Sequence, residues 1–122
     1  MSKQKVLIVE DEAWLAGQQR LLLEKAGFEV RVSPHAHAAI VQIDEFYPDV
    51  ILLDVLLPGG TAFGLLHELQ SYVDTGRIPV IICSATASEL NEADLKSYGI
   101  KRILDKTQMT PEDVVAAVKG VL

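Results

Sequence analysis

The sequence predicts an α/β fold, a doubly wound sheet of five parallel strands in the order 2-1-3-4-5 with five helices. Short apolar runs alternate with helix-like segments along the chain, and a connection that contains a helix joins parallel strands. Two of these runs, residues 6–9 and 50–53, are apolar throughout, which is typical of strands buried on both faces. Five strands favour this order over the other doubly wound order, 3-2-1-4-5-6.

The strand pattern differs between the centre and the edge of the predicted sheet. The two fully apolar runs end abruptly at acidic residues. Residues 28–32 alternate apolar and charged side chains, as a strand nearer the edge does. Strands are expected at residues 6–9, 28–32, 50–53, 79–83 and 103–104.

The helices are predicted from composition and from the signals at their ends. Gly27 and Gly99 are expected to end the first and fourth helices, because glycine readily adopts the conformation found there. Ser33 followed by Pro34 predicts the cap and the first residue of the second helix. Thr110 predicts the cap of the last helix, whose first turn is acidic. Helices are expected at residues 13–26, 34–46, 62–72 and 88–98, and from residue 111 onward.

Length and composition indicate one acidic domain spanning residues 1–122. Lys and Arg number 11 and Asp and Glu number 17, so the formal charge is 11 − 17 = −6. This charge argues against binding to nucleic acid or to an anionic membrane. A single cysteine excludes an intramolecular disulfide and a Cys-rich zinc site, and it favours a cytoplasmic location. The N-terminus is too short and polar for a signal peptide, and no apolar run approaches the ~18 residues of a membrane span.

Four predicted strands end at residues that can carry chemistry. Ligands of doubly wound folds bind beyond the carboxyl ends of the strands, where the strand order reverses, so Glu10, Asp11 and Asp54 are expected to converge. Each pair of carboxylates at ~4 Å repels by about 4 kcal/mol at an effective dielectric of ~20, and Mg²⁺ is a hard cation that would offset this repulsion. Ser84 and Lys106 end the next two strands, where a hydroxyl and an ammonium could hold a phosphoryl group.

Other phosphate-binding and metal-binding patterns fit this sequence poorly. It contains no P-loop motif, and its first strand runs into acidic residues where a dinucleotide site needs glycines. A phosphatase of the haloacid dehalogenase type would carry an aspartate where Leu56 stands. His35, His37 and His67 are expected at the surface, and Cys83 is expected to be an inert thiol in the core.

Taken together, these residues resemble the receiver domain of bacterial two-component response regulators. The resemblance covers the whole chain and implies a flavodoxin-like fold and a signalling switch rather than a turnover enzyme. Its features follow the family's order: residues 6–12, Asp54 with Pro58 four residues later, Ser84 with Ala85, and Lys106.

The resemblance implies a role for each residue of the predicted site. Asp54 would accept a phosphoryl group from a sensor histidine kinase or a phosphotransfer protein. Ser84 would move toward that group, and Lys106 would pair with it. An output domain or a downstream protein would then read the signal. The Mg²⁺ ligands would be Glu10, acting mostly through water, Asp11, Asp54 and the backbone carbonyl of Leu56.

Three positions depart from the family's usual pattern. Ile103 stands where relatives usually carry Tyr or Phe, and Thr107 stands where they usually carry Pro. Residues 61–62 read Thr-Ala where the loop commonly ends in Asp or Ser followed by Gly. The peptide bond between Lys106 and Thr107 is expected to be trans, because a cis bond that does not precede proline costs about 2.5–4 kcal/mol.

Two other functions and one residue stay open at this point. A receiver-like adaptor would bind its partners without phosphorylation, and loss of an acid or of the lysine would favour it. A Mg²⁺-dependent hydrolase would turn over small phosphoesters steadily. Trp14, in the first turn of the first helix, either packs in the core or binds a partner at the docking surface that the resemblance implies.

Overall fold

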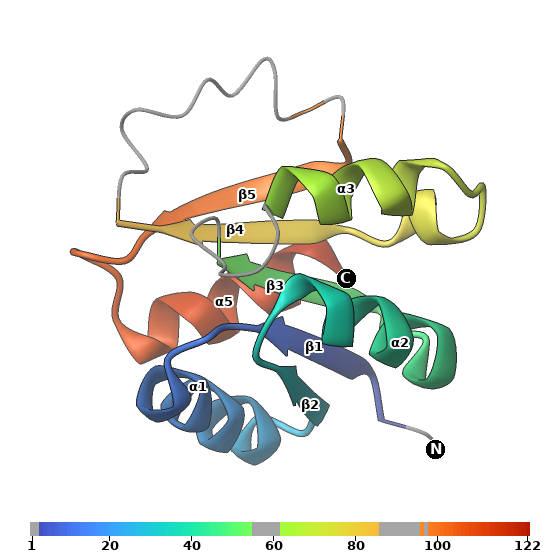
Figure 1. Ribbon diagram of the computed structural model, residues 1–122. Helices are drawn as coiled ribbons and strands as arrows, with labels where there is room; N and C mark the ends of the chain where they lie inside the picture. Colours follow the sequence, from blue (N-terminus) through green and yellow to red (C-terminus); the bar gives the residue numbers. More distant parts are fainter. Residues whose placement is uncertain (1–2, 55–61, 86–95, 97) are drawn as a thin grey trace.

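The computed structural model describes residues 3–54, 62–85, 96 and 98–122. Its strands form one parallel five-stranded sheet in the order β2-β1-β3-β4-β5, as the sequence predicts (Figure 1). The strands are β1 (Lys5–Val9), β2 (Glu29–Ser33), β3 (Val50–Asp54), β4 (Val80–Ser84) and β5 (Ile100–Asp105).

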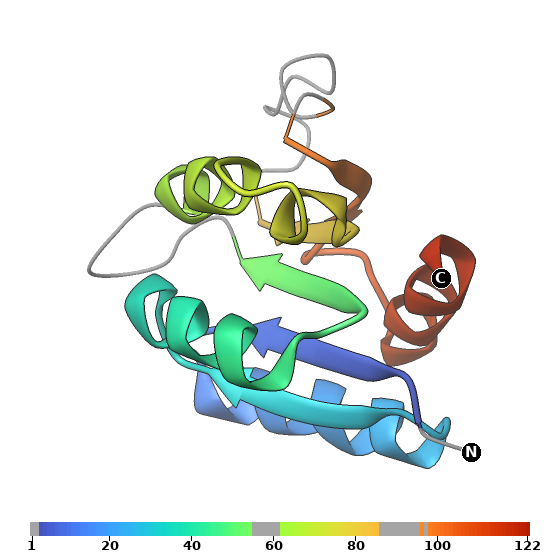
Figure 2. The same ribbon diagram turned by 90° about the vertical axis from the view of Figure 1, so that its right-hand side faces the viewer.

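Helices cover both faces of the sheet, so the fold is of the doubly wound α/β type (Figure 2). A short 3₁₀ helix, η1 (Thr75–Arg77), leads into β4. The helix expected at residues 88–98 lies almost entirely outside the described residues. One face of the sheet carries α1 (Ala13–Lys25) and α5 (Pro111–Val121), and the other carries α2 (Ala36–Phe46) and α3 (Ala62–Gln70).

The central strands β1 and β3 are buried on both faces. Leu7 of β1 pairs in register with Ile51 of β3, and both side chains are 0% exposed. Successive side chains of a strand point to opposite faces, so Leu7 packs with α2 and α3, whereas Ile8 packs with α1 and α5. Burying a side chain of this size stabilises a fold by about 1.5–3 kcal/mol. This burial specifies the register and, with it, the places where the strands end.

The start of α2 differs from the prediction. The expected cap at Ser33 and first helical residue at Pro34 are wrong, because Ser33 is the last residue of β2. There its carbonyl accepts a hydrogen bond from the backbone nitrogen of Glu10 at 3.0 Å. His35 caps the helix instead, and its Nδ1 accepts a hydrogen bond from the backbone nitrogen of Ala38 at 3.2 Å. Pairing with β1 thus outweighs the local preference of serine for a cap.

The last strand is longer than predicted. β5 begins at Ile100 rather than Ile103 and includes Lys101 and Arg102, which are both exposed. These charged residues interrupt the apolar run by which a strand is identified in a sequence. β5 accommodates them because it lies at the edge of the sheet, where it pairs with β4 alone.

The predicted end of α1 and the predicted start of α5 are confirmed, whereas the helix expected to end at Gly99 lies almost entirely outside the described residues. Gly27 and Gly99 have φ values of +101° and +79°. Thr110 Oγ1 accepts a hydrogen bond from the backbone nitrogen of Asp113 at 3.2 Å, and the Asp113 carboxylate accepts one from the backbone nitrogen of Thr110 at 2.8 Å. This capping box starts α5. No helix in the described part of the chain has both the length and the apolar composition needed to cross a membrane.

Candidate functional site

The carboxyl ends of β1 and β3 place two buried acidic side chains at one edge of the sheet. Glu10 directly follows β1, and Asp54 is the last residue of β3. Glu10 is 3% exposed and Asp54 is 5% exposed, whereas the neighbouring Asp11 is exposed. The two strands pair directly and in parallel, so their acidic residues meet at the point where the strand order reverses.

Glu10, Asp11 and Asp54 form a compact group that we call the acid cluster. One carboxylate oxygen from each of the three residues lies within 4.8 Å of the other two. Mg²⁺ prefers oxygen ligands of this kind and usually binds through one or two carboxylates together with water and phosphate oxygens. The donor set of the acid cluster therefore fits a magnesium ion.

Lys106 contacts both buried members of the acid cluster. Its Nζ lies 2.6 Å from Glu10 Oε1 and 3.0 Å from Asp54 Oδ2. The sequence predicts that a metal cation offsets the repulsion between these carboxylates. In this structure the ammonium of Lys106 supplies part of that positive charge, whereas the sequence predicts only that it pairs with a phosphoryl group.

Burial and neighbouring charges change the proton affinity of the site. Burial raises the pKa of the Glu10 carboxyl from 4.5 to about 7, with Lys106 opposing the shift and Asp54 adding to it. Burial by itself would lower the pKa of Lys106, but hydrogen bonds to Glu10 and Asp54 outweigh it and raise that pKa above its usual 10.5. The site therefore keeps its ammonium charged and takes up a proton on Glu10 more readily than an exposed glutamate would.

Ser84 and Lys106 continue the site across β4 and β5. Ser84 is the last residue of β4 and is 0% exposed, and its carbonyl accepts a hydrogen bond from the backbone nitrogen of Lys106 at 3.0 Å. Asp54 pairs in register with Cys83, the residue before Ser84. Ser84 in turn pairs with Asp105, the residue before Lys106. The Asp54 carboxylate, the Ser84 hydroxyl and the Lys106 ammonium thus belong to residues at the carboxyl ends of three neighbouring strands, β3, β4 and β5.

A turn at the end of β5 contains Lys106 and is not among the features that the sequence predicts. Asp105 Oδ1 accepts hydrogen bonds from the backbone nitrogen of Thr107 at 2.9 Å and from Thr107 Oγ1 at 2.6 Å. These two bonds hold the pKa of the Asp105 carboxyl below its usual value. The peptide bond between Lys106 and Thr107 is trans, as predicted. An aspartate two residues before a threonine is the signal that could have revealed the turn, because aspartate side chains commonly accept from the backbone two residues on.

The remaining site predictions have different outcomes. Leu56, whose carbonyl is the fourth expected metal ligand, lies outside the described residues together with Pro58. Trp14 is 70% exposed, so the alternative in which it packs in the core is wrong. Ile103 is partly buried and packs against the apolar core that lies between the sheet and helices α2 and α3.

The cysteine and the three histidines have the burial and exposure that the sequence predicts. Cys83 is 2% exposed, and burial raises the pKa of its thiol to about 12, in keeping with an inert core thiol. His35, His37 and His67 are exposed, as predicted. His67 additionally lies against Tyr98, with its Nε2 3.0 Å from the Tyr98 hydroxyl.

Comparison with known proteins relates the whole chain to one family of signalling domains. Residues 6–119 match the family model described as the response regulator receiver domain. The phosphate regulon transcriptional regulatory protein PhoB of Escherichia coli (strain K12) is 31% identical over 118 residues, which cover 97% of this chain and 51% of that protein. The chain therefore spans about half the length of the curated relatives it matches.

Solved structures show the same fold. A putative response regulator from Chloroflexus aurantiacus J-10-fl superposes with a TM-score of 0.85 at 29% identity, covering 98% of both chains. The chemotaxis response regulator CheY4 of Vibrio cholerae superposes with a TM-score of 0.90, covering 99% of this chain and 100% of that one. At 24% identity the second match shows similarity of fold alone.

Proposed function

This chain belongs to the response regulator receiver domain family, and from that membership we propose that residues 1–122 form one receiver domain that is phosphorylated on Asp54. The phosphodonor would be a sensor histidine kinase or a phosphotransfer protein. An output domain or a downstream protein would respond to the phosphorylated state. The domain would act as a signalling switch and would assist its own phosphorylation and dephosphorylation. A cytoplasmic location is part of the proposal, because one buried thiol suits a reducing compartment.

The proposed chemistry uses Asp54 as a nucleophile. An ionised oxygen of Asp54 would attack the phosphorus atom of a phosphohistidine. A P–O bond forms while the P–N bond breaks, and the imidazole leaves with the bonding electrons and then takes up a proton. The product is an acyl phosphate, which an attacking water molecule later hydrolyses. Lys106 supports this role, because its ammonium 3.0 Å from Asp54 Oδ2 favours the ionised carboxylate.

Lys106 and Ser84 would hold the transferred group. The ammonium already lies at the acceptor oxygen, so it would neutralise charge on the new phosphoryl group with little movement. Ser84 ends the strand next to Asp54 and offers a hydroxyl that would donate to a phosphoryl oxygen.

Mg²⁺ is the cofactor that we propose for the acid cluster. Asp11 and Asp54 would bind it directly, Glu10 mostly through water, and the backbone carbonyl of Leu56 would complete the protein ligands. Bound there, the metal supplies positive charge that allows an anionic phosphodonor to approach the carboxylates. The oxygen atoms gathered within 4.8 Å support this assignment.

The observation that carries the proposal is the contact of one ammonium with two buried carboxylates, which joins Lys106 to Glu10 and Asp54. Burying charged groups opposes folding unless they are well paired, and replacing such groups with apolar ones often stabilises a protein. A phosphoryl acceptor requires this charged set, whereas an adaptor that works without phosphorylation does not. The contact therefore favours the phosphorylated receiver over the adaptor.

Intact-mass analysis after incubation with acetyl phosphate and Mg²⁺ tests the proposal. We expect one added phosphoryl group in the wild type and none in Asp54→Asn. Asp11→Asn is the matched control, because it removes the same charge from the neighbouring aspartate, and it should take up one group more slowly. Full labelling of Asp54→Asn, or labelling at an unchanged rate without Mg²⁺, would contradict the proposal. Steady turnover of a chromogenic phosphoester would indicate a hydrolase instead.

A further inference from the structure

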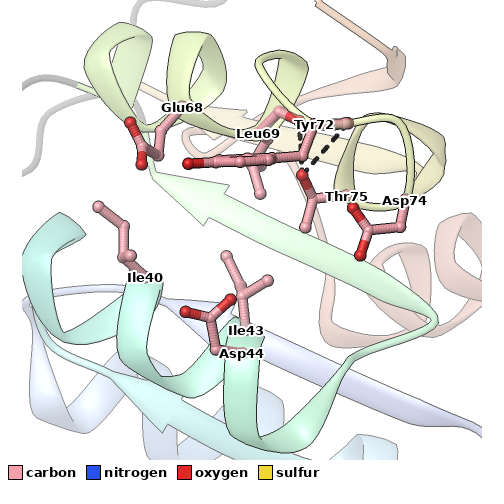
Figure 3. A pocket seen from close by; sticks show the side chains of 8 residues that line it. All are labelled: Ile40, Ile43, Asp44, Glu68, Leu69, Tyr72, Asp74 and Thr75. Carbon is pink, nitrogen blue, oxygen red and sulfur yellow. Dashed lines mark hydrogen bonds between the residues drawn. The ribbon is translucent and has the colours of Figure 1, made fainter.

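A pocket of about 190 Å³ lies between α2 and α3, and none of its lining residues belongs to the acid cluster (Figure 3). Its floor is apolar, since Ile43 and Leu69 are only 2% and 4% exposed. A cavity of ~150 Å³ is large enough to hold a benzene molecule. The pocket therefore has room for a long side chain and its terminal group.

The rim of this pocket is acidic. Asp44 of α2, Glu68 of α3 and Asp74 before η1 line the pocket and are exposed. The ion pairs among the described residues involve none of these three carboxylates. A group that enters the pocket thus meets apolar carbon below and negative charge around the opening, so a cation with an apolar stem is the complementary ligand.

An aromatic ring completes the pocket. Figure 3 shows the ring of Tyr72 edge-on above Ile43 and Asp44, so one ring face is turned toward the pocket. A cation within about 6 Å of such a face is attracted to it. Thr75 Oγ1 donates a hydrogen bond to the carbonyl of Leu69 at 2.6 Å, which ties the segment that carries Tyr72 to the end of α3.

We propose that this pocket binds an arginine side chain presented by a partner protein. The methylene groups of the arginine would lie on Ile43 and Leu69. The guanidinium would stack on the ring of Tyr72 and face the carboxylate of Asp44. Arginine suits this site better than lysine, because its planar group both stacks on an aromatic ring and hydrogen-bonds carboxylates in a fork, whereas an ammonium is a compact and strongly hydrated charge.

The surface beside the pocket favours a protein over a small free cation. Tyr47 and Val73 are 47% and 78% exposed, and the Tyr47 hydroxyl donates to the carbonyl of Asp74 at 3.0 Å. A small cation would leave this apolar area in water, whereas apolar residues flanking an arginine would cover it. A second hollow contains Tyr47, Asp74 and Arg77. Arg77 places a positive charge in that hollow beside Asp49 and Asp74, whereas no cationic side chain among the described residues lines the pocket between α2 and α3, so the arginine is assigned to the latter.

Titrations monitored by amide chemical shifts test the proposal with three probes, at saturating Mg²⁺ so that the acid cluster is occupied. The probes are a capped Leu-Arg-Leu peptide, the same peptide with citrulline in place of arginine, and ethylguanidinium. The arginine peptide should shift residues 40–44 and 68–75. The citrulline peptide has nearly the same shape without the charge and should bind about tenfold more weakly or worse. Ethylguanidinium should shift the same residues but bind several-fold more weakly than the peptide.

Surface variants locate the binding site. Asp44→Asn and Tyr72→Leu should each weaken binding of the arginine peptide by about three- to tenfold. Glu45→Gln is the matched control, because Glu45 is an exposed acid of the same helix that does not line the pocket. Its affinity for the peptide should stay at the wild-type value. Equal binding of the arginine and citrulline peptides, equal weakening by Glu45→Gln and Asp44→Asn, or binding of ethylguanidinium as tight as that of the peptide would each overturn the proposal.

Discussion

Asp105 and Thr107 are joined by two hydrogen bonds across Lys106, because the backbone nitrogen and the hydroxyl of Thr107 both donate to Asp105 Oδ1. The backbone nitrogen of Lys106 is also held, by the carbonyl of Ser84. Where family members usually have a proline ring to stiffen the chain, this protein has a turn closed by a side chain. The ammonium of Lys106 therefore projects from a fixed backbone despite the absence of proline at this position.

Asp105→Ala is expected to slow phosphorylation of Asp54. Without the carboxylate both bonds to Thr107 are lost, and Lys106 Nζ spends less time at the acceptor oxygen. The rate of labelling by acetyl phosphate should fall about three- to tenfold, since a hydrogen bond contributes about 0.5–1.5 kcal/mol. Thr107→Val keeps the backbone bond and should slow labelling less, while Thr107→Ser keeps both bonds and should match the wild type. Equal rates for Asp105→Ala and the wild type would show that the turn does not position Lys106.

The raised pKa of Glu10 predicts that the metal-free protein loses stability as the pH rises. Between the unfolded value of 4.5 and the folded value of about 7, the folded protein binds more protons than the unfolded chain. The contribution of Glu10 is thus fully present below pH 4.5 and is lost as the pH rises through about 7. In EDTA the Tm should fall over this range, and a change of about 1 kcal/mol corresponds to roughly 3–5 °C. Glu10→Gln should lack this part of the pH dependence, so parallel curves for the variant and the wild type would contradict the assignment.

Trp14→Ala is expected to weaken docking without affecting the chemistry. Trp14 is 70% exposed in the first turn of α1, and exposed tryptophans often supply much of the energy of an interface. Transfer from the cognate phosphodonor protein should slow about tenfold, whereas labelling by acetyl phosphate should not change. Val41→Ala on α2 is the control, because Val41 is also exposed, at 48%, but lies on the opposite face of the sheet. Equal slowing with both donors would indicate structural damage instead of lost docking.

Ile103 is expected to stay nearly still when Asp54 is phosphorylated. It is a branched aliphatic side chain with a restricted χ1 angle, packed against the core on the α2–α3 face. It therefore cannot swing inward as an aromatic ring would, and the signal should pass from Ser84 into residues 85–98. Chemical shifts recorded with and without beryllium fluoride as a phosphoryl mimic measure this. A large change at Ile103 together with unchanged signals from residues 85–98 would refute the prediction.

The sheet and the location of the site could be predicted because both depend on a simple pattern. An apolar run followed by a polar residue marks the carboxyl end of a buried strand, and parallel strands bring all such ends to one edge. Glu10, Asp54 and Lys106 therefore meet in space although they are far apart in the sequence, and Ser84 ends the strand between β3 and β5 at the same edge.

The features that could not be predicted depend on competition between local and tertiary interactions. Ser33 has the local preference of a helix cap, but pairing with β1 extends β2 through it and moves the cap to His35. The contact of Lys106 with Glu10 depends on the conformations of two side chains, which the spacing of residues does not determine. The pocket between α2 and α3 likewise depends on how two helices separated by a strand pack against each other, which the sequence pattern of each helix does not determine.

The reaction rate of the Cys83 thiol can be used to measure the opening of β4, the strand that pairs with β3 beside Asp54. It is the only cysteine of the chain, it pairs in register with Asp54, and it is 2% exposed. An alkylating reagent can reach the thiol only during transient opening of this part of the sheet. The ratio between the alkylation rates of the native protein and of a free thiol therefore reports the free energy of that opening. Without an engineered label, the same measurement after treatment with acetyl phosphate and Mg²⁺ would show whether the phosphorylation proposed for Asp54 makes opening of the neighbouring strand rarer.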